Sequence, residues 1–170
     1  MTDIASLLYS ERDIQRRVAE LGDEVTAHFA GRSPVLISVL KGGAMFLADL
    51  IRAVDLPLRV DFMSISRYRG STSGVVRVLK DLDQDVGGED VLVVEDIVDT
   101  GLTLNYLMNL LRARGPRSLK VAALLSKPSR RLVSVEADYT GFTIDDHFVV
   151  GYGLDYNERH RNLRDIVVYE

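Results

Sequence analysis

Residues 91–103 read VLVVEDIVDTGLT, and the rest of the chain is best interpreted outward from this stretch. Four apolar residues come first, the acids Glu95 and Asp96 follow directly, and Asp99 adds a third acid. A continuous β-branched run is typical of a strand that is buried on both faces of a parallel sheet. In such sheets ligands bind beyond the carboxyl ends of the strands, where a helix N-terminus offers N–H groups to an anion. The stretch therefore predicts a binding site at the end of a central strand.

The composition is that of an ordinary globular protein. The chain has 170 residues, 46% of them hydrophobic and 27% charged, which is enough for one domain with its own core. A net charge of -4 argues against binding nucleic acid through a basic surface. The absence of cysteine excludes a disulfide framework and a thiolate zinc site. The N-terminus lacks a signal-peptide pattern and no apolar run could span a membrane, so we expect a cytoplasmic protein without a membrane partner.

A second strand-to-helix turn is predicted near residue 41. A capping-box pattern at Ser10 starts a helix that ends near Gly31, and an apolar strand over residues 35–40 follows it. The strand stops at Lys41-Gly42-Gly43, and a helical pattern begins at residue 44. Glycines at such a turn let backbone N–H groups approach an anion closely. Taken alone, the same pattern also fits a tight turn with a surface lysine.

Residues 58–82 predict a β-hairpin with a long connection. Strands over residues 58–68 and 75–82 flank residues 69–74, which read RGSTSG. A connection of this length in a compact domain is either an exposed loop or an active-site lid. We interpret the segment as a flexible lid hairpin.

The rest of the chain continues the alternation of helices and strands. The apolar pattern that begins after residue 103 predicts a helix, and Gly115-Pro116 ends it. Further strands are predicted over residues 119–125, 148–152 and 166–169, and the short segment 142–144 is left open. This order of elements predicts an α/β fold with a mainly parallel sheet flanked by helices.

Polar side chains gather where these strands are predicted to end. The carboxyl ends of parallel strands lie along one edge of a sheet, so we expect these side chains in one cleft. Thr100, Gly101 and Thr103 would stand at a helix N-terminus, which suits one phosphate monoester. Adjacent carboxylates before such a cradle suit ribose hydroxyls and a magnesium ion. The residues alone thus predict a site for a phosphorylated sugar with Mg²⁺, built from Lys41, Glu95, Asp96, Asp99, Lys127 and Asp155.

Residues 91–103 resemble the phosphoribosyl-pyrophosphate signature of the type I phosphoribosyltransferases. Four further segments resemble, in the same order, segments of the hypoxanthine-guanine phosphoribosyltransferases: LKGG (40–43), SGVVRVLKDLD (73–83), KPSR (127–130) and FVVGYGLDYNERHRNL (148–163). The resemblance implies one phosphoribosyltransferase domain over residues 1–170, with a lid hairpin at about 58–82 and a purine-binding hood at about 126–170. It implies a purine-salvage transferase that makes IMP or GMP and pyrophosphate from hypoxanthine or guanine and phosphoribosyl pyrophosphate.

The resemblance also implies how the phosphoribosyl donor is bound. Glu95 and Asp96 would bind the ribose hydroxyls, and Asp155 would coordinate magnesium on the pyrophosphate, with both other acids counted among the metal ligands. The 5′-phosphate would lie in a loop made of Asp99, Thr100, Gly101, Leu102 and Thr103. The pyrophosphate would contact Leu40, Lys41, Gly42 and Arg161, and the family has a non-proline cis peptide between the first two.

For the purine, the resemblance implies a second set of contacts. Phe148 would stack on the ring, Lys127 would donate to the 6-oxo group, and the backbone of Val149 would read the ring edge. Asp155 would border the purine as well as the metal. Asp99 would be the base near N7 as N9 attacks the anomeric carbon. On their own, Lys127 also fits a surface lysine and Phe148 a core residue.

Other interpretations stay open at this point. A protein of the same fold could be a nucleotide-responsive regulator that binds RNA, or a transferase for another base, such as xanthine or a pyrimidine. The negative net charge and the complete purine set favour an enzyme whose partners are small molecules, and the family commonly forms homodimers or homotetramers. Ser66-Arg67-Tyr68 departs from the Ser-Tyr pair with which the family's lid usually starts, so no lid residue is assigned.

Overall fold

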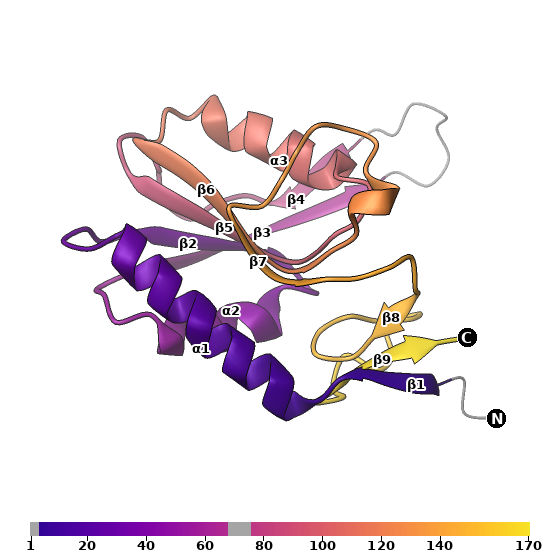
Figure 1. The fold of residues 1–170 in the computed structure, drawn as a ribbon. Helices are drawn as coiled ribbons and strands as arrows, with labels where there is room; N and C mark the ends of the chain where they lie inside the picture. The colour runs from indigo at the N-terminus through magenta and orange to yellow at the C-terminus, as the bar shows by residue number, and fades with distance from the viewer. Residues whose placement is uncertain (1–3, 68–75) are drawn as a thin grey trace.

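The computed structural model describes residues 4–67 and 76–170, whose central layer is a six-stranded sheet with the order β4-β3-β2-β5-β6-β7 (Figure 1). Every neighbouring pair is parallel except β3 and β4, which are antiparallel. The predicted mainly parallel α/β fold is therefore confirmed. The strands of this sheet are β2 (Val35–Leu40), β3 (Arg59–Arg67), β4 (Val76–Lys80), β5 (Asp90–Val98), β6 (Ser118–Ser126) and β7 (Tyr139–Thr143).

Helices cover both faces of the sheet, and β5 shows why its sequence is apolar throughout. Leu92 and Val94 belong to the core under α1 (Glu11–His28) and α2 (Ala44–Ala53), whereas Val91 and Val93 belong to the core under α3 (Leu102–Arg112). Successive side chains of a strand point to opposite faces, so a strand with a helix layer on each side must be apolar at every position. The predicted capping box at Ser10 is present at the start of α1.

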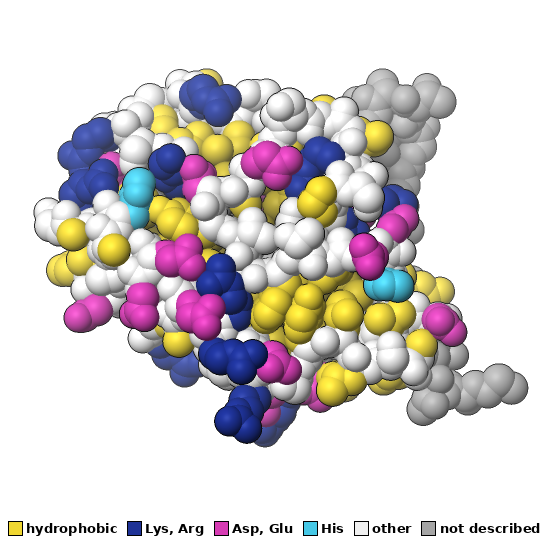
Figure 2. Space-filling view, in the orientation of Figure 1, with side chains coloured by type: hydrophobic (Ala, Val, Ile, Leu, Met, Phe, Trp, Pro, Cys, Tyr) yellow, Lys and Arg dark blue, Asp and Glu magenta, His cyan; other side chains and the backbone are white. Residues whose placement is uncertain are grey.

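A second, smaller sheet joins the two ends of the chain. Its order is β1-β9-β8, and both pairs of strands are antiparallel. Tyr9 stacks on Phe142 with ring centroids 3.9 Å apart, which packs the end of β1 against β7. Figure 2 shows hydrophobic side chains gathered between α1 and this small sheet. The members are β1 (Ile4–Tyr9), β8 (Val149–Val150) and β9 (Ile166–Tyr169).

Parts of the predicted strand pattern need correction. The strand expected over residues 148–152 covers only two residues, because Gly151 and Tyr152 adopt left-handed backbone angles, with φ of 101° and 50°. The open segment 142–144 belongs mostly to β7. Sequence analysis assigned no strand to β1, whose residues are mostly exposed and show no alternation. A short 3-10 helix, Pro128–Arg130, follows β6.

The predicted hairpin is confirmed as far as the described residues reach. β3 and β4 pair antiparallel at the edge of the main sheet. The lid predicted over residues 69–74 lies outside the described residues, and so does Tyr68 of the departing lid motif. No helix in the described ranges is both long and apolar enough to cross a membrane.

Candidate active site

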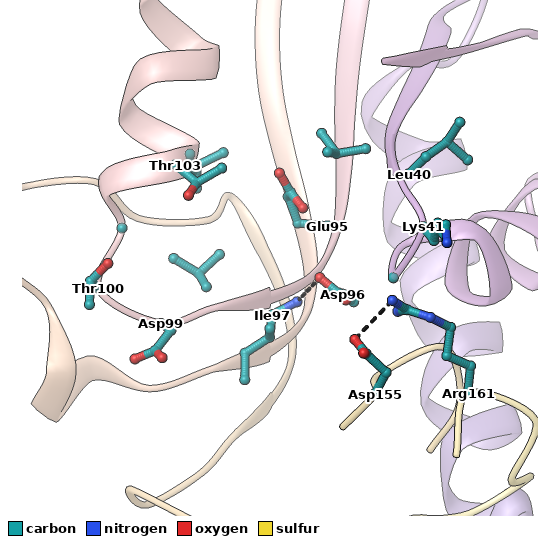
Figure 3. Close-up of a pocket in the computed structure, with 15 residues that line it drawn as sticks. Leu40, Lys41, Glu95, Asp96, Ile97, Asp99, Thr100, Thr103, Asp155 and Arg161 are labelled. Atoms are coloured by element: carbon teal, nitrogen blue, oxygen red, sulfur yellow. Dashed lines mark hydrogen bonds and ion pairs between the residues drawn. The ribbon is translucent and has the colours of Figure 1, made fainter. Parts of the chain in front are cut away.

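A cavity of about 370 Å³ opens at the carboxyl ends of β2 and β5 (Figure 3). Segments that are far apart in sequence meet there: the turn after β2, the end of β5 with the start of α3, and the loop after β8. Leu102 is on the helix surface and does not line the cavity. The predicted residues that do line it are Leu40, Lys41, Gly42, Glu95, Asp96, Asp99, Thr100, Gly101, Thr103, Asp155 and Arg161.

The paired acids lie inside β5 rather than after it. The strand continues to Val98, and Glu95 still pairs with Ala123 of β6, so the prediction that the acids terminate the strand was wrong. The side chains of Glu95 and Asp96 consequently point to opposite sides of the strand (Figure 3). Burial, together with the charge of Asp96, raises the pKa of Glu95 well above its usual range. Burial also raises the pKa of Asp96, although the Ile97 N–H donates to its carboxylate at 2.8 Å.

Gly42 is required by the position of Asp96. A Cβ atom added to Gly42 would lie 1.8 Å from Asp96 Oδ2, so any other residue at this turn would displace the carboxylate. The peptide bond between Leu40 and Lys41 is cis, as predicted. The turn therefore brings its backbone at Gly42 directly against Asp96.

The loop before α3 forms the opposite wall of the cavity. Gly101 is the N-cap of α3 with a left-handed φ of 81°, and the Leu102 N–H donates to Thr100 Oγ1 at 3.4 Å. A Cβ on Gly101 would lie 2.6 Å from Val135 and 2.9 Å from the Arg131 side chain, so glycine is needed for both its backbone angle and its packing. The N-terminus of α3, with the hydroxyls of Thr100 and Thr103 beside it, is suited to an anion such as a phosphate monoester.

Cationic side chains face the acids from the other side. Arg161 forms an ion pair with Asp155 at 2.9 Å and donates to the carbonyl of Gly153 at 2.7 Å (Figure 3). Arg161 Nε is buried and has no hydrogen-bond partner among the described residues. Lys41 Nζ lies 2.7 Å from Glu158 Oε2, and sequence analysis did not identify Glu158 as a site residue.

Lys127 does not line this cavity, so its predicted place in a common cleft stays a prediction. It is buried, with 6% of its surface exposed, and its ammonium lies 3.7 Å from Asp146. Arg130 contacts Asp146 at 3.2 Å and Asp99 at 3.0 Å. A row of alternating charges thus connects Lys127 with the cavity. Little in the sequence indicated this row of charges, because Arg130 and Asp146 look like any other charged residues in a connecting segment.

Phe148 and Val149 also lie outside the cavity lining, on the small sheet. Phe148 is 52% exposed and is not a core residue, whereas Val149 is buried. Tyr156 and Tyr169 lie edge-on to the Phe148 ring, with centroid distances of 5.9 and 6.0 Å. The result is an exposed aromatic surface. Tyr152 is buried and donates its hydroxyl to Asp49 at 2.5 Å.

The site residues fit a magnesium ion that is carried by a phosphate ligand. No group of three or more His, Cys, Asp or Glu side chains in the described ranges is arranged to hold a metal by itself. Mg²⁺ is usually bound by one or two carboxylates, by water and by substrate phosphates. Asp96 and Asp155 both line the cavity; burial raises the pKa of Asp96, and the charge of Asp155 adds to this rise while that of Arg161 opposes it. A cation between the acids and a bound phosphate would relieve this repulsion.

Comparison with known proteins identifies the family. The family model for the phosphoribosyl transferase domain matches residues 6–157. The chain is 52% identical over 163 residues to the hypoxanthine-guanine phosphoribosyltransferase of Bacillus subtilis, covering 95% of this chain and 91% of that protein. It is 52% identical over 169 residues to the enzyme of the same name from Mycobacterium avium, covering 95% and 83%.

Solved structures agree in fold. A hypoxanthine phosphoribosyltransferase from Staphylococcus aureus superposes with a TM-score of 0.95 at 45% identity, covering 99% of this chain and 92% of that chain. A variant of the enzyme from Trypanosoma cruzi, solved with the product IMP, superposes with a TM-score of 0.93 at 43% identity, covering 98% and 91%. The predicted enzyme class and purine-salvage function are confirmed. The chain belongs to the hypoxanthine-guanine phosphoribosyltransferases, within the phosphoribosyltransferase family.

Proposed function

We propose that the cavity transfers the phosphoribosyl group of phosphoribosyl pyrophosphate to N9 of hypoxanthine or guanine, giving IMP or GMP and pyrophosphate. One observation carries this proposal: the cavity combines buried acids, a helix N-terminus and cationic side chains. These three parts match the ribose hydroxyls, the 5′-phosphate and the pyrophosphate of the donor. The names of the relatives support the same bases.

On the donor side of the site, each part of the substrate has its own wall of the cavity. We define the donor side as Leu40 to Gly42, Glu95, Asp96, residues 99–103, Asp155 and Arg161. Glu95 and Asp96 would accept hydrogen bonds from the ribose hydroxyls, and residues 99–103 would cradle the 5′-phosphate through the N-terminus of α3. The backbone at Leu40 and Gly42 would donate to the pyrophosphate, with Lys41 and Arg161 supplying positive charge.

The pyrophosphate must leave while the ribose gains oxocarbenium character. Lys41 and Arg161 would stabilise the charge that develops on the leaving group. Asp155, with Glu95 and Asp96, would hold Mg²⁺ on the pyrophosphate, and the bound ion would supply further neutralisation of its charge. Water must be excluded from the reacting carbon, because it would hydrolyse the donor. The lid predicted over residues 69–74 would serve this purpose.

The purine side, defined as Lys127, Phe148 and Val149, would hold the base against the donor. Phe148 would stack on the ring, the Val149 backbone would read its edge, and Lys127 would donate to the 6-oxo group, with Asp155 close by. A buried ammonium cannot pair with a 6-amino group, which accounts for a preference for 6-oxopurines. As N9 attacks the anomeric carbon and the bond to pyrophosphate breaks, Asp99 would accept the proton from N7.

The test is a turnover assay with phosphoribosyl pyrophosphate and magnesium, in which hypoxanthine, guanine, xanthine and adenine are offered in turn. We expect nucleotide to form with hypoxanthine or guanine, to require magnesium, and to fall strongly in Asp99→Asn and Lys127→Ala. Asp23→Asn, an exposed substitution on α1, is the control. Tight nucleotide binding without turnover of any base would overturn the proposal in favour of a regulator. The predicted cytoplasmic location and the homodimeric or homotetrameric state stay predictions, which fractionation and light scattering would test.

A further inference from the structure

Glu158 holds the two cations that the proposed function assigns to pyrophosphate. Its Oε2 atom lies 2.7 Å from Lys41 Nζ, and its Oε1 atom lies 3.1 Å from the Arg161 guanidinium. The two carboxylate oxygens therefore each take one cation. Glu158 is 63% exposed, so this contact is not forced by packing in a core. A single anion that bridges two cations in this way occupies the same charges that a phosphate oxygen would use.

The backbone places Glu158 at this point. The N–H of Glu158 donates to Asp155 Oδ2 at 2.8 Å, and Glu158 has a left-handed φ of 64°. The loop that carries it is locked against the turn after β2, because a Cβ on Gly153 would lie 2.2 Å from the carbonyl oxygen of Gly42. Arg161 closes the loop by donating to Gly153. The carboxylate therefore lies beside Lys41 because two packed loops bring the residues together.

This arrangement has a direct consequence for an incoming anion. Lys41 and Arg161 have several N–H donors each, so their geometry alone does not prevent them from binding two anions. Two anions on the same pair of cations repel each other, however, and the exposed carboxylate is the one that can move into water. Binding of pyrophosphate must then break both ion pairs of Glu158.

We propose that Glu158 is an internal competitor of pyrophosphate, which occupies Lys41 and Arg161 in the free enzyme and returns to them when pyrophosphate leaves. The inference rests on the proposed function, since it takes these two cations as the pyrophosphate site. Glu158 would weaken the binding of the donor and of the product in equal measure. It would also favour product release, a step that limits turnover in many enzymes.

Isothermal titration of inorganic pyrophosphate with magnesium into the full-length protein tests this directly. Exposed ion pairs contribute little, so we expect Glu158→Gln to bind pyrophosphate about threefold to fivefold more tightly than the wild type. The KM for phosphoribosyl pyrophosphate should fall in parallel, whereas the KM for the purine should not change. Unchanged or weaker pyrophosphate binding would overturn the inference, because Glu158 would then be neutral or would hold the cations in place for the ligand.

Two further variants separate competition from a general effect of charge. Glu158→Asp keeps the charge but is one methylene shorter, and aspartate tolerates the left-handed backbone well. If the contact itself matters, this variant should also bind pyrophosphate more tightly. If it behaves like the wild type while Glu158→Gln binds more tightly, the effect is simple repulsion and the inference is wrong. Asp23→Asn removes the same charge far from the site and should leave the affinity unchanged.

Comparing Arg161→Gln with the wild type tests the proposed pyrophosphate site separately from the role of Glu158. We expect Arg161→Gln to lose most of its affinity for pyrophosphate. If it binds as well as the wild type, the pyrophosphate site lies elsewhere and the proposed assignment fails. If it loses affinity while Glu158→Gln gains none, only the role of Glu158 is rejected.

Discussion

The donor side and the purine side of the site are built in different ways. Most of the donor side follows the strands β2 and β5 of the main sheet and lines one cavity, to which the loop after β8 adds Asp155 and Arg161. On the purine side, Lys127 follows β6 and Phe148 precedes β8, and neither lines that cavity. Strands with helices on both faces position most of the donor side, whereas the purine side includes a loop and a small edge sheet. This difference indicates a preformed donor pocket beside a more loosely built purine surface.

The largest expected effect is on kcat, and it comes from Asp99, at which the donor side and the purine side meet. Asp99→Asn should lower kcat about 10²- to 10⁴-fold, since general-base catalysis contributes rate factors of that size. The KM for the donor should change little, because the 5′-phosphate cradle keeps its backbone. Steady-state kinetics would measure both quantities. Arg130→Gln is the matched control, since it removes the same 3.0 Å ion pair but keeps the carboxylate. A similar loss of kcat in both variants would show that the ion pair, rather than the base, is responsible.

A second substitution tests whether the donor pocket is preformed. The Cβ of Gly42→Ala would force Asp96 to move, so hydrogen bonds between a charged group and the ribose would be lost. We expect the KM for phosphoribosyl pyrophosphate to rise about 10- to 100-fold with little change in the purine KM. In Gly31→Ala the new Cβ meets nothing within 4 Å, so only stability should suffer from its φ of 74°. An unchanged donor KM in Gly42→Ala would mean that this wall of the pocket adapts to its ligand.

A smaller effect is expected on the purine side. Phe148→Ala removes a half-exposed ring, so the free energy of unfolding should change little while the purine KM rises about threefold to tenfold through lost stacking. Leu7→Ala, at another exposed position of the small sheet, should change neither KM. Thermal unfolding and steady-state kinetics would measure the two quantities. A large loss of stability would show that Phe148 supports the fold and would weaken its assignment to the purine.

The smallest effect on the two KM values is expected from a substitution at the amino end of β5. Buried Asp90 accepts hydrogen bonds from Arg117 and Ser118, and Arg117 is the largest cause of the fall in its pKa to about 2. Because the pKa is lower in the folded state, this group stabilises the fold above about pH 4, and the contribution of about 2 kcal/mol is lost as the pH falls toward 2. Asp90→Asn should therefore lower stability at pH 7 but approach the wild type at low pH.

Denaturant unfolding as a function of pH would measure the contribution of Asp90. Both KM values should stay unchanged in Asp90→Asn, since the residue lies at the other end of β5 from the acids of the cavity. A changed donor KM would mean that strain at one end of β5 reaches the other, and the two ends could not be treated separately. A stability difference that persists at low pH would point to packing instead of charge.

The face shown in Figure 2 does not favour the alternative of an RNA-binding regulator. On the face shown in Figure 2, Lys and Arg side chains are interspersed with Asp and Glu side chains and form no continuous basic patch. Nonspecific binding of nucleic acid depends on concentrated positive charge. This agrees with the net charge of -4 and with an enzyme whose ligands are small molecules.

Most donor-side residues line one cavity, as the order of strands and turns predicts, whereas the purine-side residues lie outside its lining. The roles of both sets stay predictions. Buried strands, glycine turns and helix starts depend on residues that are adjacent in sequence, so the order from β2 to α3 could be predicted together with the edge at which the site lies. Lys127 was expected in the same cleft, but its exposure and its partner Asp146 depend on how the chain after β6 folds back. The strand expected over residues 148–152 ends before Gly151, because the backbone angles of Gly151 and Tyr152 are set by the loop that follows.

The sequence by itself determined the strand-to-helix units of the donor side, because each unit is a local pattern: an apolar run buried between two helix layers, then acids or glycines, then a helix start. Only the tertiary structure decided which side chains that are far apart in the sequence form ion pairs. Glu158 and Lys41 are 117 positions apart, and Arg130 and Asp99 are 31 apart. The pairing of β1 with β9 was decided in the same way. An ion pair or an edge strand leaves no periodic pattern in a sequence, since it depends on a partner that only the folded chain brings near.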